Sequence, residues 1–149
     1  MKLKVFKIRD TAKLPDRAHE SDAGMDLFYC PEGDINFNIP PGSSTVLPTG
    51  LKIEVPSGYM LEIKNKSGIA SKKQLLVGAC VIDSGYDGEI LINLHNISSQ
   101  YKMIESGQKI AQAVLIPIEI PFLIEVDDDD IYGAETPRGA GGFGSTGTS

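Results

Sequence analysis

Apolar residues alternate with polar ones along most of this chain, at the period of two that is typical of half-buried β-strands. Turn residues separate the alternating runs, as in the Pro- and Gly-containing segments 40–42, 48–50 and 56–58. Short strands with such spacing predict an all-β fold, a jelly-roll-like β-sandwich or barrel. The apolar positions of the four clearest runs are Ile35, Phe37 and Ile39; Leu51, Ile53 and Val55; Tyr59, Leu61 and Ile63; and Ile90, Ile92 and Leu94.

Only residues 67–75 are expected to form a helix. Ser67 is the expected N-terminal cap, since its hydroxyl can accept a hydrogen bond from the first turn. The free N–H groups beside Ser67 and Gly68 would then face an anion.

A glycine-containing segment, 78–88, lies between two apolar stretches. We expect residues 81–82 and 89–92 to pair as a β-hairpin, which would place Asp83 where a strand opens into a loop, with Tyr86 three residues further on. Asp and Gly are also common in ordinary turns, so the segment alone leaves a purely structural role open.

The composition fits one globular domain. The chain has 149 residues, of which 41% are hydrophobic, enough for a modest core. A net charge of -6 argues against nucleic acid or an anionic membrane surface as partner. The two cysteines, Cys30 and Cys80, lack metal-ligand spacing, and no apolar run is long enough for a bilayer or a signal peptide. We therefore expect reduced thiols and a cytoplasmic protein, or one of the host cytoplasm if it is viral.

The C-terminal part has a different character. Residues 122–126 are expected to form a last strand, and the aspartates of 127–130 a solvated hinge rather than a metal site, because consecutive aspartates point to alternate sides. In 138–147, Arg138 and Phe143 stand among glycines, so the segment offers phosphate contacts and one aromatic face. We expect a β domain over 1–126 and a flexible arm over 127–149 that a nucleotide orders; a disordered Gly/Ser tail is the alternative.

Five segments of the chain, in order, resemble the five motifs of the homotrimeric dUTPases, the deoxyuridine triphosphate nucleotidohydrolases. The segments are Ala23-Gly24-Met25-Asp26-Leu27, Lys66-Ser67-Gly68-Ile69-Ala70, residues 78–88, Gly107-Gln108-Lys109-Ile110-Ala111-Gln112, and residues 138–147. The resemblance covers nearly the whole chain. It implies a jelly-roll homotrimer that hydrolyses dUTP to dUMP and pyrophosphate with Mg²⁺, limiting uracil in DNA and supplying dUMP for thymidylate synthesis.

The same resemblance implies roles for individual residues. Asp83 would orient and deprotonate the attacking water, and Tyr86 would pack on the deoxyribose. Asp26 would hold waters around the magnesium ion that the triphosphate chelates. The arm would close from a neighbouring subunit, with Phe143 over the uracil. The implied substrate-binding residues are Lys66, Ser67, Gly68, Val77, Gly78, Val81, Ile82, Tyr86, Gln112, Arg138, Phe143, Gly144, Ser145 and Thr146.

Three residues depart from the family pattern. Lys66 stands where the family usually has arginine, so the point charge of an ammonium group replaces a planar guanidinium at the phosphates. Cys80 stands where relatives often have glycine, and it either narrows the uracil pocket or points into the core. Asp87, where many relatives have arginine or glutamine, is interpreted as a turn carboxylate.

Two other functions stay open at this stage. One is a deoxycytidine triphosphate deaminase, which shares the fold but relies on a glutamate base and an arginine-rich second motif. The other is a binding or regulatory protein that kept the trimer and lost catalysis, for which damage at Asp83 or in the arm would be expected. Both places are intact in this chain.

Overall fold

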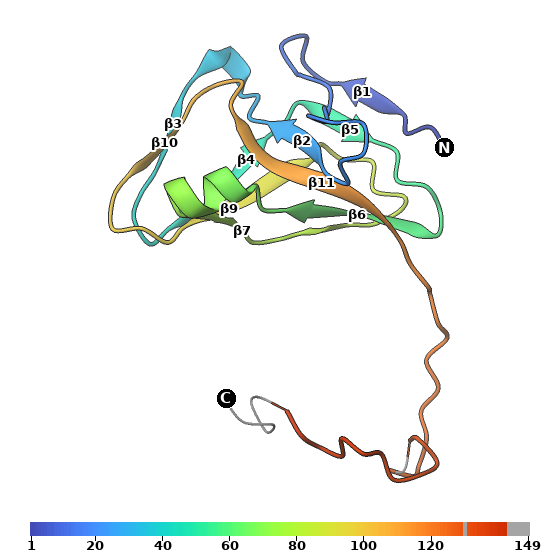
Figure 1. Cartoon of the computed structure of the whole chain (residues 1–149). Coiled ribbons are helices and arrows are strands. Elements are labelled where there is room, and N and C mark those ends of the chain that lie inside the picture. Colours follow the sequence, from blue (N-terminus) through green and yellow to red (C-terminus); the bar gives the residue numbers. More distant parts are fainter. Residues whose placement is uncertain (130, 143–149) are drawn as a thin grey trace. The chain divides into compact units, whose positions relative to one another are not determined.

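The computed structural model describes residues 1–129 and 131–142. The chain divides into two compact units, Met1–Glu119 and a second unit that begins at Ile120. All the strands of the described residues lie in the first unit, which therefore carries the predicted all-β fold (Figure 1).

The elements of the first unit are short, as their turn-rich sequence predicts. They are β1 (Val5–Lys7), β2 (Met25–Phe28), η1 (Glu32–Asp34), β3 (Phe37–Ile39), β4 (Ser44–Pro48), β5 (Leu51–Ile53), β6 (Tyr59–Lys64), η2 (Ile69–Lys73), β7 (Leu75–Val77), β8 (Val81–Ile82), β9 (Leu91–Asn96), β10 (Lys102–Ile104) and β11 (Lys109–Pro117).

The strands form four antiparallel sheets. The largest has the order β2-β11-β6-β8, and a three-stranded sheet has the order β4-β9-β7. The pairs β1-β5 and β10-β3 complete the fold. The long strand β11 pairs with β2 along one edge and with β6 along the other (Figure 1). Residues from distant parts of the sequence, such as Asp26 and Gln112, thereby become direct neighbours.

The alternating apolar residues fill the core, as predicted for three of the four runs. Leu51, Ile53 and Val55 are buried, and so are Ile90, Ile92 and Leu94. In the third run Leu61 and Ile63 are buried, and Tyr59 is partly buried against the core. In the fourth run Ile39 is buried but Ile35 and Phe37 are exposed. This last segment reaches the core only at its end, where β3 pairs with β10 alone.

The predicted helix at 67–75 is shorter than expected. The element η2 spans Ile69–Lys73, and its N-cap is Gly68, with no side-chain capping bond, so the expected cap by Ser67 is wrong. The carbonyl of Ser67 instead accepts a hydrogen bond from the Ser71 hydroxyl at 2.6 Å. The turn ends at Gln74, whose left-handed backbone (φ 55°) lets its N–H reach the carbonyl of Ile69.

Two predicted strand arrangements are also wrong. Residues 81–82 form β8, which pairs with β6, whereas 91–96 form β9, which pairs with β4 and β7. The two stretches therefore belong to different sheets and make no hairpin. Residues 122–126 form no strand, and the side chains of Phe122, Leu123 and Ile124 are exposed. Among the described residues no helix is long and apolar enough to span a membrane.

Candidate active site

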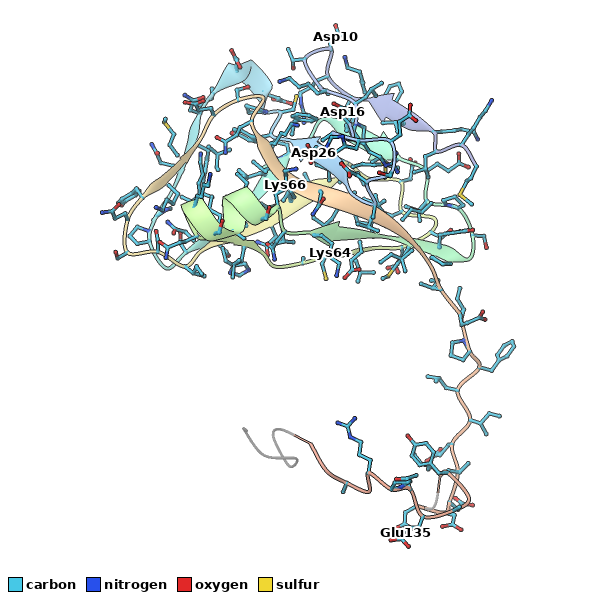
Figure 2. The ribbon with its side chains drawn as sticks, in the orientation of Figure 1. Asp10, Asp16, Asp26, Lys64, Lys66 and Glu135 are labelled. Atoms are coloured by element: carbon cyan, nitrogen blue, oxygen red, sulfur yellow. The ribbon has the colours of Figure 1, made fainter. Side chains whose placement is uncertain are left out.

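A buried carboxylate with two lysine partners lies where β2 meets β11. Asp26 is only 4% exposed, although it stands in a strand whose other residues are apolar. Its Oδ1 accepts a hydrogen bond from Lys66 Nζ, and its Oδ2 accepts one from Lys109 Nζ at 2.7 Å. Figure 2 labels Asp26 and Lys66, which lie next to each other. The three side chains form an ion triad, Lys66–Asp26–Lys109.

The triad holds Asp26 ionised. Burial raises the pKa of this carboxyl group, but the hydrogen bonds and charges of Lys109 and Lys66 outweigh burial and bring the pKa below its ordinary value. The hydrogen bond to Asp26 correspondingly raises the pKa of Lys109. The cluster therefore carries one negative and two positive charges at neutral pH.

Two members of the triad, Asp26 and Lys66, line a cavity of about 310 Å³, which we call the lysine cavity. Its lining residues are Ala18, Asp22, Ala23, Gly24, Asp26, Lys66, Gln112 and Val114. Gln112 Nε2 donates to the carbonyl of Asn65 at 2.9 Å. A Cβ on Gly24 would lie 1.9 Å from Gln112 Oε1, so the absent side chain at Gly24 leaves room for this amide. The lysine cavity thus brings together Asp26, Lys66 and Gln112, three of the predicted site residues.

Ser67 and Gly68 follow Lys66 but are not among the residues that line the lysine cavity. They directly precede η2, and Gly68 is its N-cap.

A second cavity, of about 190 Å³, contains Val77 and Gly78 and is called the turn cavity here. Its lining residues are Glu62, Ile63, Lys64, Asn65, Val77, Gly78 and Cys80. Cys80 therefore reaches this cavity with a partly exposed side chain instead of pointing into the core.

Two asparagines fix the backbone of the turn at 77–79. The N–H of Val77 donates to Asn65 Oδ1 at 2.7 Å, and the N–H of Ala79 donates to Asn93 Oδ1 at 3.2 Å. The N–H of Gly78 donates to the main-chain carbonyl of Asn93 at 2.9 Å. These three donors already have partners, whereas no described residue donates to the carbonyls of Gly78 and Ala79. The turn therefore has two main-chain carbonyls that are free to accept a hydrogen bond.

Gly78 also has no room for a side chain. A Cβ at this position would lie 2.1 Å from Asn93 Oδ1 and 2.3 Å from His95 Nε2. These two atoms contact each other at 3.1 Å. The turn is therefore packed directly against β9.

A third cavity, of about 200 Å³, contains Asp83 and is called the aspartate cavity. Its lining residues are Ile63, Ala79, Val81, Ile82, Asp83, Tyr86, Glu89 and Leu91. Asp83 follows β8, and the carbonyl of Asp83 accepts a hydrogen bond from the N–H of Tyr86 at 3.3 Å, which closes the turn. No described residue makes a hydrogen bond or ion pair with the carboxylate of Asp83, so its oxygens are free to accept a hydrogen bond from a bound molecule.

Most of the predicted site residues of the first unit thus lie in three cavities. The turn and aspartate cavities share Ile63, whereas Lys66 and Asp83 line different cavities. In the second unit, Arg138 Nε donates to the carbonyl of Gly141 at 3.1 Å. Phe143, Gly144, Ser145 and Thr146 lie outside the described residues.

Sequence reasoning missed several residues that shape these cavities. Lys109 lies in the fourth motif, but its contact with Asp26 depends on the pairing of β11 with β2, which the sequence does not show. Asn65 and Asn93 gave no signal, because their role depends on which backbone groups the fold brings to them. Glu89 carries the only other carboxylate of the aspartate cavity in the described residues.

Metal binding by the protein alone receives little support from these groups. The described residues contain no cluster of three or more His, Cys, Asp or Glu side chains that could hold a metal ion. Both carboxylate oxygens of Asp26 already accept hydrogen bonds from lysine ammonium groups.

Comparisons with known proteins agree with this arrangement. The family model described as dUTPase matches residues 10–147. A protein of Gloeothece citriformis named deoxyuridine 5'-triphosphate nucleotidohydrolase is 40% identical over 149 residues, covering 99% of this chain and 97% of the relative. A protein of the same name from Alkaliphilus metalliredigens is 40% identical over 147 residues, covering 97% and 96%.

Solved structures show the same fold. A mutant dUTPase of Staphylococcus bacteriophage 80alpha with dUpNHpp has a TM-score of 0.86, with 28% identity and 99% coverage of both chains. A mutant dUTPase from phage phi11 of S. aureus, described with a structural Mg(II) ion, has a TM-score of 0.76 and 26% identity, covering 87% of this chain and 99% of that one. The fold is therefore the jelly roll of these enzymes, as predicted. On its sequence and its fold together, the chain belongs to the dUTPase family.

Proposed function

We propose that this protein hydrolyses dUTP to dUMP and pyrophosphate with Mg²⁺, which would limit uracil incorporation into DNA and supply dUMP for thymidylate synthesis. The observation that carries the proposal is 40% identity, over nearly the whole chain, to proteins named for this activity. The aspartate cavity adds a site for the chemistry, because it pairs an unpartnered carboxylate with the ring of Tyr86.

In the proposed reaction Asp83 is the general base. A water that donates a hydrogen bond to this carboxylate attacks the α-phosphorus, and its proton passes to the carboxylate as the bond to the bridging oxygen breaks. Pyrophosphate is the leaving group. Tyr86 lies in the same cavity, with its hydroxyl donating to the carbonyl of Glu89 at 3.0 Å, and its ring would pack on the deoxyribose.

The phosphate chain belongs to the lysine cavity in this proposal. Lys66 and Gln112 offer an ammonium and an amide donor there, and Ser67 and Gly68 follow directly in the chain. Because Lys66 shares Asp26 with Lys109, it can turn to a phosphate while Asp26 keeps one counter-ion. The uracil would contact Val77 and Gly78 in the turn cavity and Val81 and Ile82, which line the aspartate cavity.

Magnesium would enter with the substrate. The triphosphate oxygens are its natural ligands, and when bound the ion neutralises negative charge on the leaving pyrophosphate. Asp26 would hold ion-bound waters through lone pairs that the lysines leave free. A relative described with a structural Mg(II) ion supports a metal in the family.

The proposal includes a homotrimer with active sites shared between subunits. It is supported by the separation of Asp83 and Lys66 into different cavities of one chain, which a neighbouring copy could bring together. Residues 127–149 would be the arm, exchanged between subunits, with Arg138, Ser145 and Thr146 at the γ-phosphate and Phe143 over the uracil. Gly144 would be a further substrate-binding residue of the arm. A cytoplasmic location is proposed because the substrate is a nucleotide and Cys30 and Cys80 are free thiols.

Release of pyrophosphate from dUTP, dCTP, dTTP and UTP, with and without Mg²⁺, tests the function. We expect rapid turnover of dUTP alone. Ammonia release from dCTP would favour the deaminase, and binding of dUTP without turnover would favour a regulatory protein.

A further inference from the structure

We propose that Glu89 and Arg9 act as a positioning pair for the loop that carries Asp83 and Tyr86. The proposal rests on the function proposed above and adds two residues to its machinery. It starts from the loop 83–90, which leaves β8 at Asp83 and returns to β9 at Leu91 and contains no strand of its own. The loop must therefore be held by other contacts.

Tyr86 depends directly on Glu89. The Tyr86 hydroxyl donates to the main-chain carbonyl of Glu89 at 3.0 Å. Gly88 lies beneath the ring, because a Cβ there would come within 2.2 Å of the Tyr86 hydroxyl oxygen. The ring thus lies across the loop backbone, and its place follows the backbone at 88–89.

The side chain of Glu89 anchors that backbone to the sheet core. Its Oε1 accepts hydrogen bonds from Arg9 Nη2 and from the N–H of Gly50, the latter at 2.7 Å. The adjoining N–H of Ile90 donates to the carbonyl of Leu51 at 2.8 Å, and the Thr49 hydroxyl donates to the carbonyl of Ile90 at 2.7 Å. The C-terminal end of the loop 83–90 is consequently fixed to the β4–β5 connection and to the start of β5.

Arg9 extends the anchor to a third segment. Its Nε donates to the carbonyl of Cys30 at 3.1 Å while its Nη2 holds Glu89. The side chains of Arg9 and Glu89 are 18% and 22% exposed, so water screens the pair less than it screens surface ions. The planar guanidinium serves both partners at once, which a lysine ammonium could not do with the same geometry.

This pairing also separates the two carboxylates of the aspartate cavity by role. Glu89 is engaged by Arg9 and Gly50, whereas the carboxylate of Asp83 has no described partner. Asp83 therefore remains the group that can take a proton, and Glu89 holds the loop. Both line the same cavity, so a shift of Glu89 would move Tyr86 and change the shape of the cavity next to Asp83.

The test uses Arg9→Met, Glu89→Gln and the double variant, together with Tyr86→Phe. Asp87→Asn is the matched control, since Asp87 lies in the same loop in an ion pair with Lys52 and is 92% exposed. For each protein, kcat and KM are measured for dUTP and UTP, and thermal stability and oligomeric state are measured in parallel.

We expect each single substitution in the pair to lower kcat for dUTP by about 10- to 100-fold, the scale of a misplaced catalytic group. Because the pair acts as one unit, the double variant should be no worse than the poorer single variant. Discrimination against UTP should weaken in both single variants and in Tyr86→Phe, which removes only the hydroxyl contact. The control should match the parent protein.

Folded Arg9→Met and Glu89→Gln variants with the parent's kcat and its dUTP-to-UTP preference would overturn the proposal. The proposal would also be overturned if kcat for dUTP fell only in proportion to the loss of thermal stability while the dUTP-to-UTP preference stayed unchanged. The pair would then have a purely structural role. If neither pair variant folds, an unchanged UTP preference in Tyr86→Phe would overturn it. Failure of the parent protein to hydrolyse dUTP would instead reject the proposed function itself.

Discussion

Lys109 Nζ lies 2.7 Å from Oδ2 of Asp26, while Lys66 holds the other carboxylate oxygen. One buried acid thus connects the strand of the first motif, the residue that opens the second and the strand of the fourth. The arrangement explains how a charged side chain is accommodated in β2, because each oxygen has a cationic donor.

We expect Asp26→Asn to lower the free energy of unfolding by about 1–3 kcal/mol near neutral pH, less than for a fully buried pair since the lysines are partly exposed. The folded-state pKa of Asp26 lies below its ordinary value, so this stabilisation exists above the unfolded pKa of about 3.9 and is lost as pH falls through the folded pKa. Urea unfolding of both proteins from neutral to acid pH measures it. A difference in unfolding free energy between the two proteins that stays constant down to the lowest pH would contradict the proposed stabilisation by the triad.

The second prediction concerns the base. Asp83→Asn should bind dUTP normally and lose turnover by roughly two to four orders of magnitude, the usual scale of a positioned general base. Calorimetric titration with dUTP and a pyrophosphate-release assay separate the two effects. Glu54→Gln is a suitable control, since Glu54 is an exposed carboxylate that pairs with Lys4 and lines none of the three cavities. Near-normal turnover in Asp83→Asn would place the base elsewhere.

Sharing of sites between subunits can be tested by mixing two inactive variants. Asp83→Asn and Lys66→Met are each expected to be poorly active, but subunits that exchange at random should regain intact sites at about one site in four, because each site would take one residue from each copy. Turnover is measured before and after a mixture is unfolded and refolded together. Absence of recovery, with trimers formed, would mean that both residues serve one site in the same chain.

Deleting residues 138–149 should leave stability unchanged and reduce turnover sharply. Arg138 is exposed, and the buried core of the described residues lies entirely in the first unit, so the deletion removes no core side chain. Thermal unfolding and dUTP hydrolysis are compared with the full chain. A truncated protein with full dUTP hydrolysis would contradict the proposed role of the arm in turnover.

Phe143→Ala tests stacking of the aromatic ring on the base, for which about 1–3 kcal/mol of binding free energy is expected.

The strands were predictable where one face of a sheet is buried against the core. Leu51, Ile53 and Val55 alternate in sequence and are all buried, because β5 lies over the interior. Periodicity does not identify a strand's partner, which is why 81–82 and 89–92 were paired wrongly. The apolar run at 122–126 has the composition of a strand but no neighbouring strand within the described residues.

The cavities were predictable only in part, for a similar reason. Asp26, Lys66 and Gln112 each belong to a family motif, and the fold brings them to one cavity. The contact between Lys109 and Asp26 follows from the pairing of β11 with β2, and the anchoring of Glu89 by Arg9 joins residues 80 positions apart. Interactions at such separations depend on the completed fold rather than on local pattern.

The packing at Gly78 limits how this enzyme could be redesigned for another base. Any side chain there would strike Asn93 and His95, so a library that varies position 78 would return mainly misfolded turns. Cys80 lines the same cavity with a partly exposed side chain, so variation there would change the shape of the cavity while the backbone carbonyls of the turn stay in place. Under the proposal that uracil binds at this cavity, position 80 is the place where a base with an added methyl group would be accommodated.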